Sequence, residues 1–238
     1  GVIEEDKAKG LVKYAKPVGV VAAIAPSTNP SATPVNKAMM ALKGANAVIV
    51  APSPAGANTT TKTVDYMRDE LEKIGLPADL VQVLPQPVNK ALTQTLMEAA
   101  DLVVVTGSQN NVRRAYSSGT PAIGVGAGNV SVIIDSGADL KDAADKITQS
   151  KIFDNATSCS SENALIILED VYDAALEALK DAGGYLATAE EKDKIQATLW
   201  VGGHLNRKVI AKNAAVFAAE AGLSGDADGA AFFMVEDD

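Results

Sequence analysis

The chain alternates between short apolar runs and segments of helical periodicity, and this pattern constrains its fold more than any other feature. Helical spacing of apolar residues occurs at 33–42, 58–74, 90–99, 109–118 and 139–151. The apolar runs have the length of buried strands and lie at 18–25, 47–51, 80–84, 102–106, 130–135 and 164–168. Strands that alternate with helices favour βαβ units and a parallel sheet. We therefore expect an α/β fold of the Rossmann type.

Composition and charge exclude several classes of protein. The 238 residues are 47% hydrophobic and 21% charged, which is typical of a globular protein with a substantial core. The formal net charge of -9 disfavours binding to nucleic acid and to anionic membranes. No apolar stretch approaches the roughly 20 residues that span a bilayer. The single cysteine excludes an internal disulfide, and the acidic start of the chain is unlike a signal peptide. We expect a cytoplasmic protein and a chain that is part of a longer polypeptide.

Three loops deserve notice as candidate ligand sites, because parallel sheets bind ligands at the carboxyl ends of their strands. Residues 26–30 follow the first apolar run, and residues 106–108 follow the fourth and open a helix. The amides of 106–108 and the Ser108 hydroxyl could therefore receive a pyrophosphate. Residues 124–129 contain three alternate glycines but precede a strand, the reverse of the order in a dinucleotide fingerprint. They predict a tight turn.

Few side chains offer catalytic chemistry. Cys159 lies in the polar run 154–162, which suits a nucleophile, although a buried and inert cysteine fits the sequence about as well. Asn29 precedes a proline and reads either as a turn residue or as an amide donor to an oxyanion. His204 is the only histidine and lies in a glycine-rich turn typical of an exposed residue. One histidine and one cysteine do not make a zinc site, so we expect no metal.

Taken together, these segments resemble the aldehyde dehydrogenase superfamily and, within it, the CoA-acylating branch. Residues 25–30 are similar to the Pro-x-x-Asn-Pro loop of that family, residues 105–108 to its Thr-Gly-Ser loop, and residues 154–162 to the nucleophile segment of acylating members. The most specific stretch is 115–129. It is similar to the acetaldehyde domain of bifunctional aldehyde/alcohol dehydrogenases and to acylating succinate-semialdehyde and sulfoacetaldehyde dehydrogenases.

The resemblance implies a domain organisation and a set of site residues. Residues 1–131 would form an NAD-binding domain that lacks its N-terminal part, and residues 132–238 would form a partial catalytic α/β domain. A homo-oligomer is also implied. Cys159 would be the nucleophile, and the Asn29 amide would hold the oxyanion together with the Cys159 backbone N–H. The residues implied in cofactor binding are Pro26, Ser27, Thr28, Ser53, Thr106, Gly107, Ser108, Gly124, Val125 and Gly126.

The resemblance also indicates which molecule receives the acyl group from the cysteine. Hydrolytic members activate water with a glutamate, and Gly124 occupies the matching position here. Water needs a general base, whereas the CoA thiol is already partly ionised near neutral pH. The absent side chain would also leave room for CoA. We therefore expect oxidation of a small aldehyde to its acyl-CoA. Two alternatives stay open: a hydrolytic NAD(P)-dependent enzyme with another base, and a noncatalytic nucleotide-binding or assembly module in which Cys159 packs.

Cofactor and substrate are less constrained. Residues 51–56 contain no basic residue that could contact a 2'-phosphate, which favours NAD over NADP. The amino-acid sequences of the motifs are most similar to those of sulfoacetaldehyde dehydrogenases, followed by those of succinate-semialdehyde and acetaldehyde enzymes. An anionic aldehyde would need a nearby cation. Arg113 and Arg114 are available, but we expect them on a solvated helix face. We assign Glu162 a structural role, such as pairing or capping.

Overall fold

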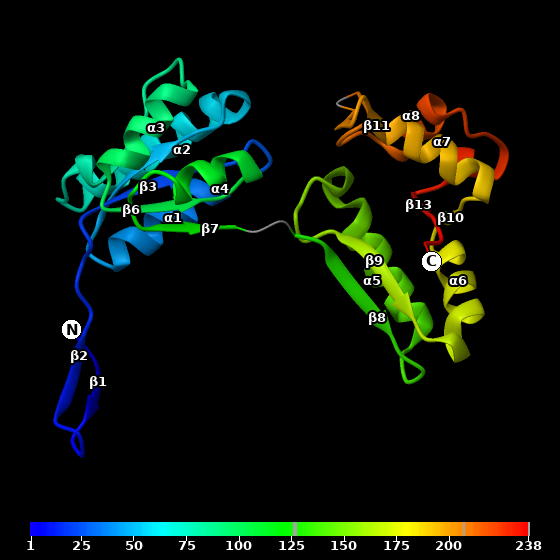
Figure 1. The fold of residues 1–238 in the computed structure, drawn as a ribbon, viewed down its shortest axis with the longest axis horizontal. Helices are drawn as coiled ribbons and strands as arrows, with labels where there is room; N and C mark the ends of the chain where they lie inside the picture. Colours follow the sequence, from blue (N-terminus) through cyan, green and yellow to red (C-terminus); the bar gives the residue numbers. More distant parts are fainter. Residues whose placement is uncertain (126–127, 207, 238) are drawn as a thin grey trace. The chain divides into compact units, whose positions relative to one another are not determined.

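The computed structural model describes residues 1–125, 128–206 and 208–237, and it divides the chain into two compact units. The first unit comprises residues 1–127 and the second residues 128–238. Figure 1 shows the order of their helices and strands. The expected boundary after residue 131 lies inside strand β8 (Val130–Ile134), all of which belongs to the second unit.

A parallel five-stranded sheet forms the centre of the first unit, as the alternation of strands and helices predicts. The strand order is β5-β4-β3-β6-β7, so the chain runs from β3 outward to β5 and then returns to the other side of β3. The order therefore reverses between β3 and β6, where open α/β sheets bind ligands. The strands are β3 (Val20–Ile24), β4 (Ala47–Ala51), β5 (Val81–Val83), β6 (Leu102–Val105) and β7 (Ala122–Gly124).

Helices cover both faces of this sheet, because side chains of a strand alternate between its faces. Val21 and Ala23 of β3 pack in a core with α1 and α2. Ala22 and Ile24 of the same strand pack in a second core with α3 and α4. The helices are α1 (Ala32–Lys43), α2 (Ala57–Lys73), α3 (Lys90–Ala99) and α4 (Gln109–Tyr116), with the short 3-10 helices η1 (Pro54–Gly56) and η2 (Ala78–Leu80).

An antiparallel hairpin at the start of the chain is a feature that the sequence pattern did not predict. It consists of β1 (Val2–Asp6) and β2 (Leu11–Tyr14) (Figure 1). Its apolar side chains are exposed, with 67% of Ile3 and 60% of Tyr14 accessible to solvent. An isolated two-stranded hairpin is marginally stable in water.

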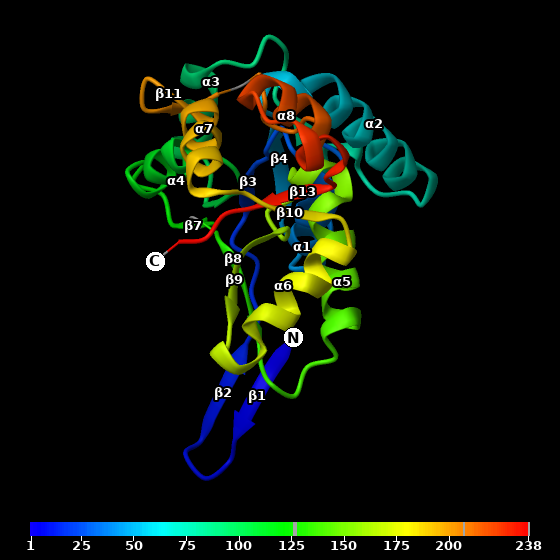
Figure 2. The ribbon, with the colours of Figure 1, turned by 90° about the vertical axis from the view of Figure 1, so that its right-hand side faces the viewer.

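The second unit begins with the parallel pair β8 (Val130–Ile134) and β9 (Glu162–Ile167). The helices α5 (Leu140–Ile152) and α6 (Tyr172–Asp181) lie side by side against this pair (Figures 1 and 2). Their contact buries the side chains of Ile134, Ala144, Ile147, Ala175 and Leu179.

The rest of the second unit is built on a second parallel pair, β10 (Gly184–Leu186) and β13 (Phe232–Met234). A small core around Ile195 and Ala218 packs the two helices that carry these residues against this strand pair. None of the helices in the described ranges is both long and apolar enough to cross a bilayer. The remaining elements are α7 (Ala189–Leu199), β11 (Trp200–Val201), β12 (His204–Leu205) and α8 (Ala214–Ala221), with η3 (Phe153–Ala156), η4 (Glu169–Val171) and η5 (Gly225–Gly229).

Candidate active site

Asn29 lies in the exposed loop between β3 and α1, and its amide is held in a defined orientation. The Asn29 Oδ1 atom accepts a hydrogen bond of 3.1 Å from the backbone N–H of Ala32, in the first turn of α1. Because a backbone N–H can only donate, this bond identifies the oxygen end of the amide. The Nδ2 end is the one that can donate to a ligand. The Asn29 side chain can therefore stabilise the turn through Oδ1 and donate to an oxyanion through Nδ2.

The end of the same loop is tied to α2. The hydroxyl of Thr60, whose side chain is 1% exposed, donates a hydrogen bond of 2.8 Å to the carbonyl oxygen of Pro30. Gly56 packs against the same proline, since a Cβ at position 56 would lie 2.7 Å from the Pro30 Cβ. The loop that carries Asn29 is thus fixed at its far end by residues that the sequence analysis missed.

The loop after β6 lies next to the loop after β3. The Thr106 N–H donates to the Ile24 carbonyl at 3.1 Å, and a Cβ at Gly107 would lie 3.7 Å from the Pro26 Cα. Gly107 has a φ of +138°, which favours glycine at this close approach. Ser108 accepts a hydrogen bond of 3.3 Å from the Asn111 N–H and so caps α4. The predicted loops meet where the strand order reverses.

The loop after β4 ends at the same edge of the sheet. Strand β4 stays paired with β3 up to the start of this loop, because the Ala25 N–H donates a hydrogen bond of 3.0 Å to the Ala51 carbonyl. The Ser53 Oγ accepts a hydrogen bond of 3.2 Å from the Gly56 N–H and caps the 3-10 turn η1. Ser27 and Thr28, in the neighbouring loop, are exposed. These polar groups and backbone amides form an edge that fits a nucleotide cofactor.

Gly124, at the end of β7, corrects one part of the sequence argument. Its N–H donates to the Tyr116 hydroxyl at 3.1 Å, and a Cβ here would lie only 2.8 Å from the Val112 Cγ1. Side chains of α4 therefore fill the space into which a side chain at position 124 would project. This space is not available to CoA. Val125 is exposed, whereas Gly126 lies outside the described residues.

Lys37 is a buried charge that sequence reasoning missed. Its side chain on α1 is 5% exposed, and its Nζ donates a hydrogen bond of 3.3 Å to the carbonyl oxygen of Val104 in β6. Burial lowers the pKa of Lys37 to about 8, because removal from water penalises the charged ammonium. The only sign of this burial in the sequence was the position of Lys37 on the inner face of a helix.

Arg114 does not lie on the free helix face that we expected. Its Nε donates to the Gln94 Oε1 at 3.1 Å, and its guanidinium also contacts the Lys90 carbonyl. These bonds tie α4 to α3, so Arg114 has a structural role. Arg113 is exposed, as predicted.

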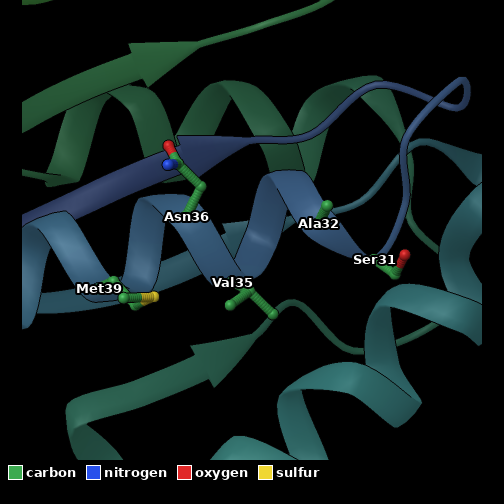
Figure 3. A pocket seen from close by; sticks show the side chains of 5 residues that line it. All are labelled: Ser31, Ala32, Val35, Asn36 and Met39. Atoms are coloured by element: carbon green, nitrogen blue, oxygen red, sulfur yellow. The ribbon is translucent and has the colours of Figure 1, made fainter.

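The outer face of α1 carries a shallow hollow of about 420 Å³. In Figure 3, Val35 and Met39 project to the same side of the helix, and Asn36 projects to another. Met39 is 66% exposed. None of the lining residues is ionisable, so this hollow supplies no cation for an anionic aldehyde. The lining residues are Ser31, Ala32, Val35, Asn36 and Met39.

Cys159 belongs to the second unit and is exposed. It follows three consecutive residues in the left-handed region, Asp154, Asn155 and Ala156, with φ values of 48°, 52° and 57°. Asp and Asn adopt left-handed backbone more readily than other non-glycine residues, so the cost of roughly 1–2 kcal/mol falls mainly on Ala156. The Thr157 hydroxyl donates to the Asp154 carbonyl at 2.6 Å and closes this turn. The exposure excludes the alternative in which Cys159 packs in the core of its own unit.

A second turn surrounds Cys159 itself. The Ser158 and Ser160 hydroxyls lie 2.8 Å apart, and the Ser161 N–H donates to the Ser158 carbonyl at 3.2 Å. Cys159 is therefore at a tight bend whose neighbouring side chains bond to one another. Ser161 turns inward and is 2% exposed. Such a bend can present a thiol to a small carbonyl compound.

His204 is exposed in the β11–β12 hairpin, as the sequence predicts. Across the described ranges, no group of three or more His, Cys, Asp or Glu side chains is placed to hold a metal ion.

The fold and the site residues define a class of protein: a unit built on a parallel five-stranded sheet, followed by a unit that presents an exposed cysteine. The chain matches the aldehyde dehydrogenase family over residues 2–220, and it belongs to that family. It is 55% identical over 223 residues to the acylating sulfoacetaldehyde dehydrogenase of Cupriavidus necator, covering 94% of this chain and 45% of the relative. The chain thus spans about half the length of the curated relatives that it matches.

Solved structures place the fold in the same branch. An acetylating aldehyde dehydrogenase from Geobacillus thermoglucosidasius superposes with a TM-score of 0.91 at 37% identity, over 100% of this chain and 53% of that chain. A propionaldehyde dehydrogenase from Rhodopseudomonas palustris, solved with bound CoA and an acylated cysteine, gives a TM-score of 0.81 at 28% identity, over 92% of this chain and 51% of that one. The resemblance to the CoA-acylating branch is therefore confirmed.

Proposed function

We propose that this chain carries the nucleophile and cofactor loops of an NAD-dependent acylating aldehyde dehydrogenase, which oxidises a small aldehyde to its acyl-CoA. The observation that carries the proposal is the exposed thiol of Cys159 at a hydrogen-bonded bend that follows a left-handed turn. The acylating relatives support it, including the one whose cysteine is acylated in the presence of CoA.

The proposed chemistry is the one that the resemblance to acylating aldehyde dehydrogenases implies for these residues. The Cys159 thiolate attacks the aldehyde carbon and forms a C–S bond, and the Asn29 Nδ2 amide and the Cys159 N–H donate to the resulting oxyanion. Bound NAD supplies the acceptor for the hydride that leaves this carbon. Cys159 then carries a thioester. Attack by the CoA thiolate on its carbonyl releases the acyl-CoA and returns Cys159 as a thiolate.

The choice of CoA over water is supported by the absence of a carboxylate at position 124. Gly124 cannot remove a proton from water, and its packing against Val112 explains why the position remains a glycine. A thiol acceptor needs less help from a base, because it is already partly ionised near neutral pH. A hydrolytic enzyme with another base is the alternative, and its turnover would not require CoA.

The first unit is proposed as the NAD-binding domain. Its residues fit a dinucleotide in two respects: the loops after β3, β4 and β6 end at one edge, and Gly107 permits close approach of the backbone there. Pro26, Ser27, Thr28, Ser53, Thr106, Gly107, Ser108, Gly124, Val125 and Gly126 are the proposed contacts. The lack of a basic residue in 51–56 supports NAD over NADP.

Sulfoacetaldehyde is the proposed substrate, with succinate semialdehyde and acetaldehyde as the next candidates. The 55% identity to the acylating sulfoacetaldehyde dehydrogenase supports this order. A cytoplasmic homo-oligomer completes the proposal. The single cysteine supports the reducing compartment, and the exposed apolar side chains of the β1–β2 hairpin support pairing with a second copy.

A coupled assay of the full gene product tests this function. The protein is given each of the three aldehydes with NAD or NADP, with and without CoA, and nicotinamide reduction is followed. We expect turnover that requires CoA and is abolished by Cys159→Ala, with NAD binding retained. Turnover that ignores CoA would support the hydrolytic alternative. NAD binding without turnover on any aldehyde would support a noncatalytic module.

A further inference from the structure

One side chain joins the two ends of the segment that carries Cys159. Lys151 lies in the last turn of α5, and its Nζ donates a hydrogen bond of 3.1 Å to the Oδ1 of Asn163 in β9. Residues 151 and 163 bracket the left-handed turn, the bend and the thiol. The bond therefore closes this segment at its base.

The same lysine faces a buried carboxylate oxygen. The Glu162 Oε2 is buried and has no hydrogen-bond partner among the described residues. Burial lowers the pKa of Lys151, and the charge of Glu162 partly offsets this by raising it. Both residues line a cavity of about 770 Å³ in the second unit. A buried, unpartnered carboxylate oxygen is costly, and a nearby cation reduces that cost.

This arrangement matters because the enclosed segment is strained. Three successive left-handed residues persist only where their surroundings determine the conformation. The bonds within 154–161 join near neighbours, and the Asn155 side chain makes a long contact of 3.5 Å to the Ala211 carbonyl. Lys151 instead connects the helix before the segment to the strand after it. Loss of this connection would let the ends move apart and the strained turn relax.

We propose that Lys151 is a positioning residue that holds Cys159 in its reactive placement by tying α5 to Asn163 and by countering the Glu162 charge. The proposal rests on the proposed function, in which Cys159 is the nucleophile. It assigns no contact between Lys151 and the substrate. Lys151 acts through the segment between them.

The test uses the single cysteine of the chain as its own reporter. The rate of Cys159 alkylation by iodoacetamide is measured by intact mass at one fixed pH, and amide hydrogen exchange is measured in parallel. Lys151→Met removes the donor and the charge but keeps the aliphatic stem, Lys151→Arg keeps both, and Asn163→Leu removes the acceptor. Lys146→Met is the matched control, because Lys146 lies on the same helix, is 73% exposed and pairs with Asp142.

We expect Lys151→Met to raise amide exchange within 153–161 by about tenfold, the effect of losing one charge-assisted hydrogen bond in a local opening. The rate of alkylation should move to that of an unstructured peptide of the same segment. Asn163→Leu should move the rate in the same direction, Lys151→Arg should restore most of the wild-type rate, and Lys146→Met should not alter it.

Two results would overturn the proposal. One is a wild-type alkylation rate in a folded Lys151→Met protein. The other is faster exchange spread evenly over α5 and β9 with an unchanged alkylation rate, which would indicate a merely structural role. Failure of the proposed function would look different, since it would leave the alkylation results intact while wild-type Cys159 formed no adduct with an aldehyde.

Discussion

The Thr60 hydroxyl donates a hydrogen bond of 2.8 Å to the Pro30 carbonyl oxygen and thereby ties α2 to the loop that carries Asn29. Thr60→Val keeps the shape of the side chain but removes the donor. We expect the free energy of unfolding to fall by about 1 kcal/mol, because a buried carbonyl loses its partner. Urea unfolding measures this. Thr63→Val is the control, because the Thr63 hydroxyl lies on the same helix and donates only to the Thr59 carbonyl one turn earlier; equal losses in both variants would contradict the assigned role.

Asn29 combines two functions in one amide, and two substitutions separate them. Asn29→Asp keeps an oxygen that can accept from the Ala32 N–H, so its stability should match the wild type. It lacks the donor, and its carboxylate repels an oxyanion. We expect turnover to fall by about 100-fold or more in both Asn29→Asp and Asn29→Ala. Near-normal turnover by Asn29→Asp would show that Asn29 is only a turn residue.

Gly124 should tolerate no side chain, because its Cβ direction is filled by Val112 and Tyr116. Gly124→Ala is expected to lower the free energy of unfolding by about 1–3 kcal/mol through overpacking. Gly137→Ala is the control, since a Cβ at Gly137 meets nothing within 4 Å. Thermal unfolding of the two variants checks this. A glutamate at 124 should likewise destabilise the unit before it can redirect the acyl group to water. Equal stability of the two alanine variants would refute the steric argument.

Lys37 gives the protein a predictable pH dependence. Its pKa is about 8 in the folded chain, below the ordinary lysine value of 10.5, so between these values the unfolded state binds more protons. Stability should therefore rise as the pH increases from about 8 toward 10.5. Compared with Lys37→Met, the wild type should gain on the order of 1–2 kcal/mol over this window. Urea unfolding at several pH values measures the difference, and parallel curves for the two proteins would contradict it.

Much of the fold could be predicted from the sequence where segments are long and strongly patterned. The predicted ranges 47–51 and 90–99 coincide with β4 and α3, and the other predicted elements differ by a few residues at their ends. The β1–β2 hairpin was missed because neither strand shows the alternation of apolar and polar residues that marks a half-buried strand, and its apolar residues are exposed. Strand β7, at three residues, is too short to show a period.

The residues of the candidate site could be predicted where they lie in a local motif. Contacts between residues far apart in the sequence could not. Asn29 and Cys159 stand in recognisable loops, and both are exposed as a reactive group requires. The partners of Thr60 and Lys37 lie 30 and 67 residues away in the sequence, so no local pattern reveals these bonds. The packing at Gly124 depends on the side chains of α4, which only the fold brings to that strand.

Intact-mass spectrometry of the full gene product tests the central claim most directly. The protein is incubated with an aldehyde and NAD in the absence of CoA, and CoA is then added. The account predicts an acyl adduct on Cys159 that accumulates first and disappears as acyl-CoA forms. If no adduct appears on Cys159 although NAD is reduced, or if the adduct persists in the presence of CoA, the account is contradicted.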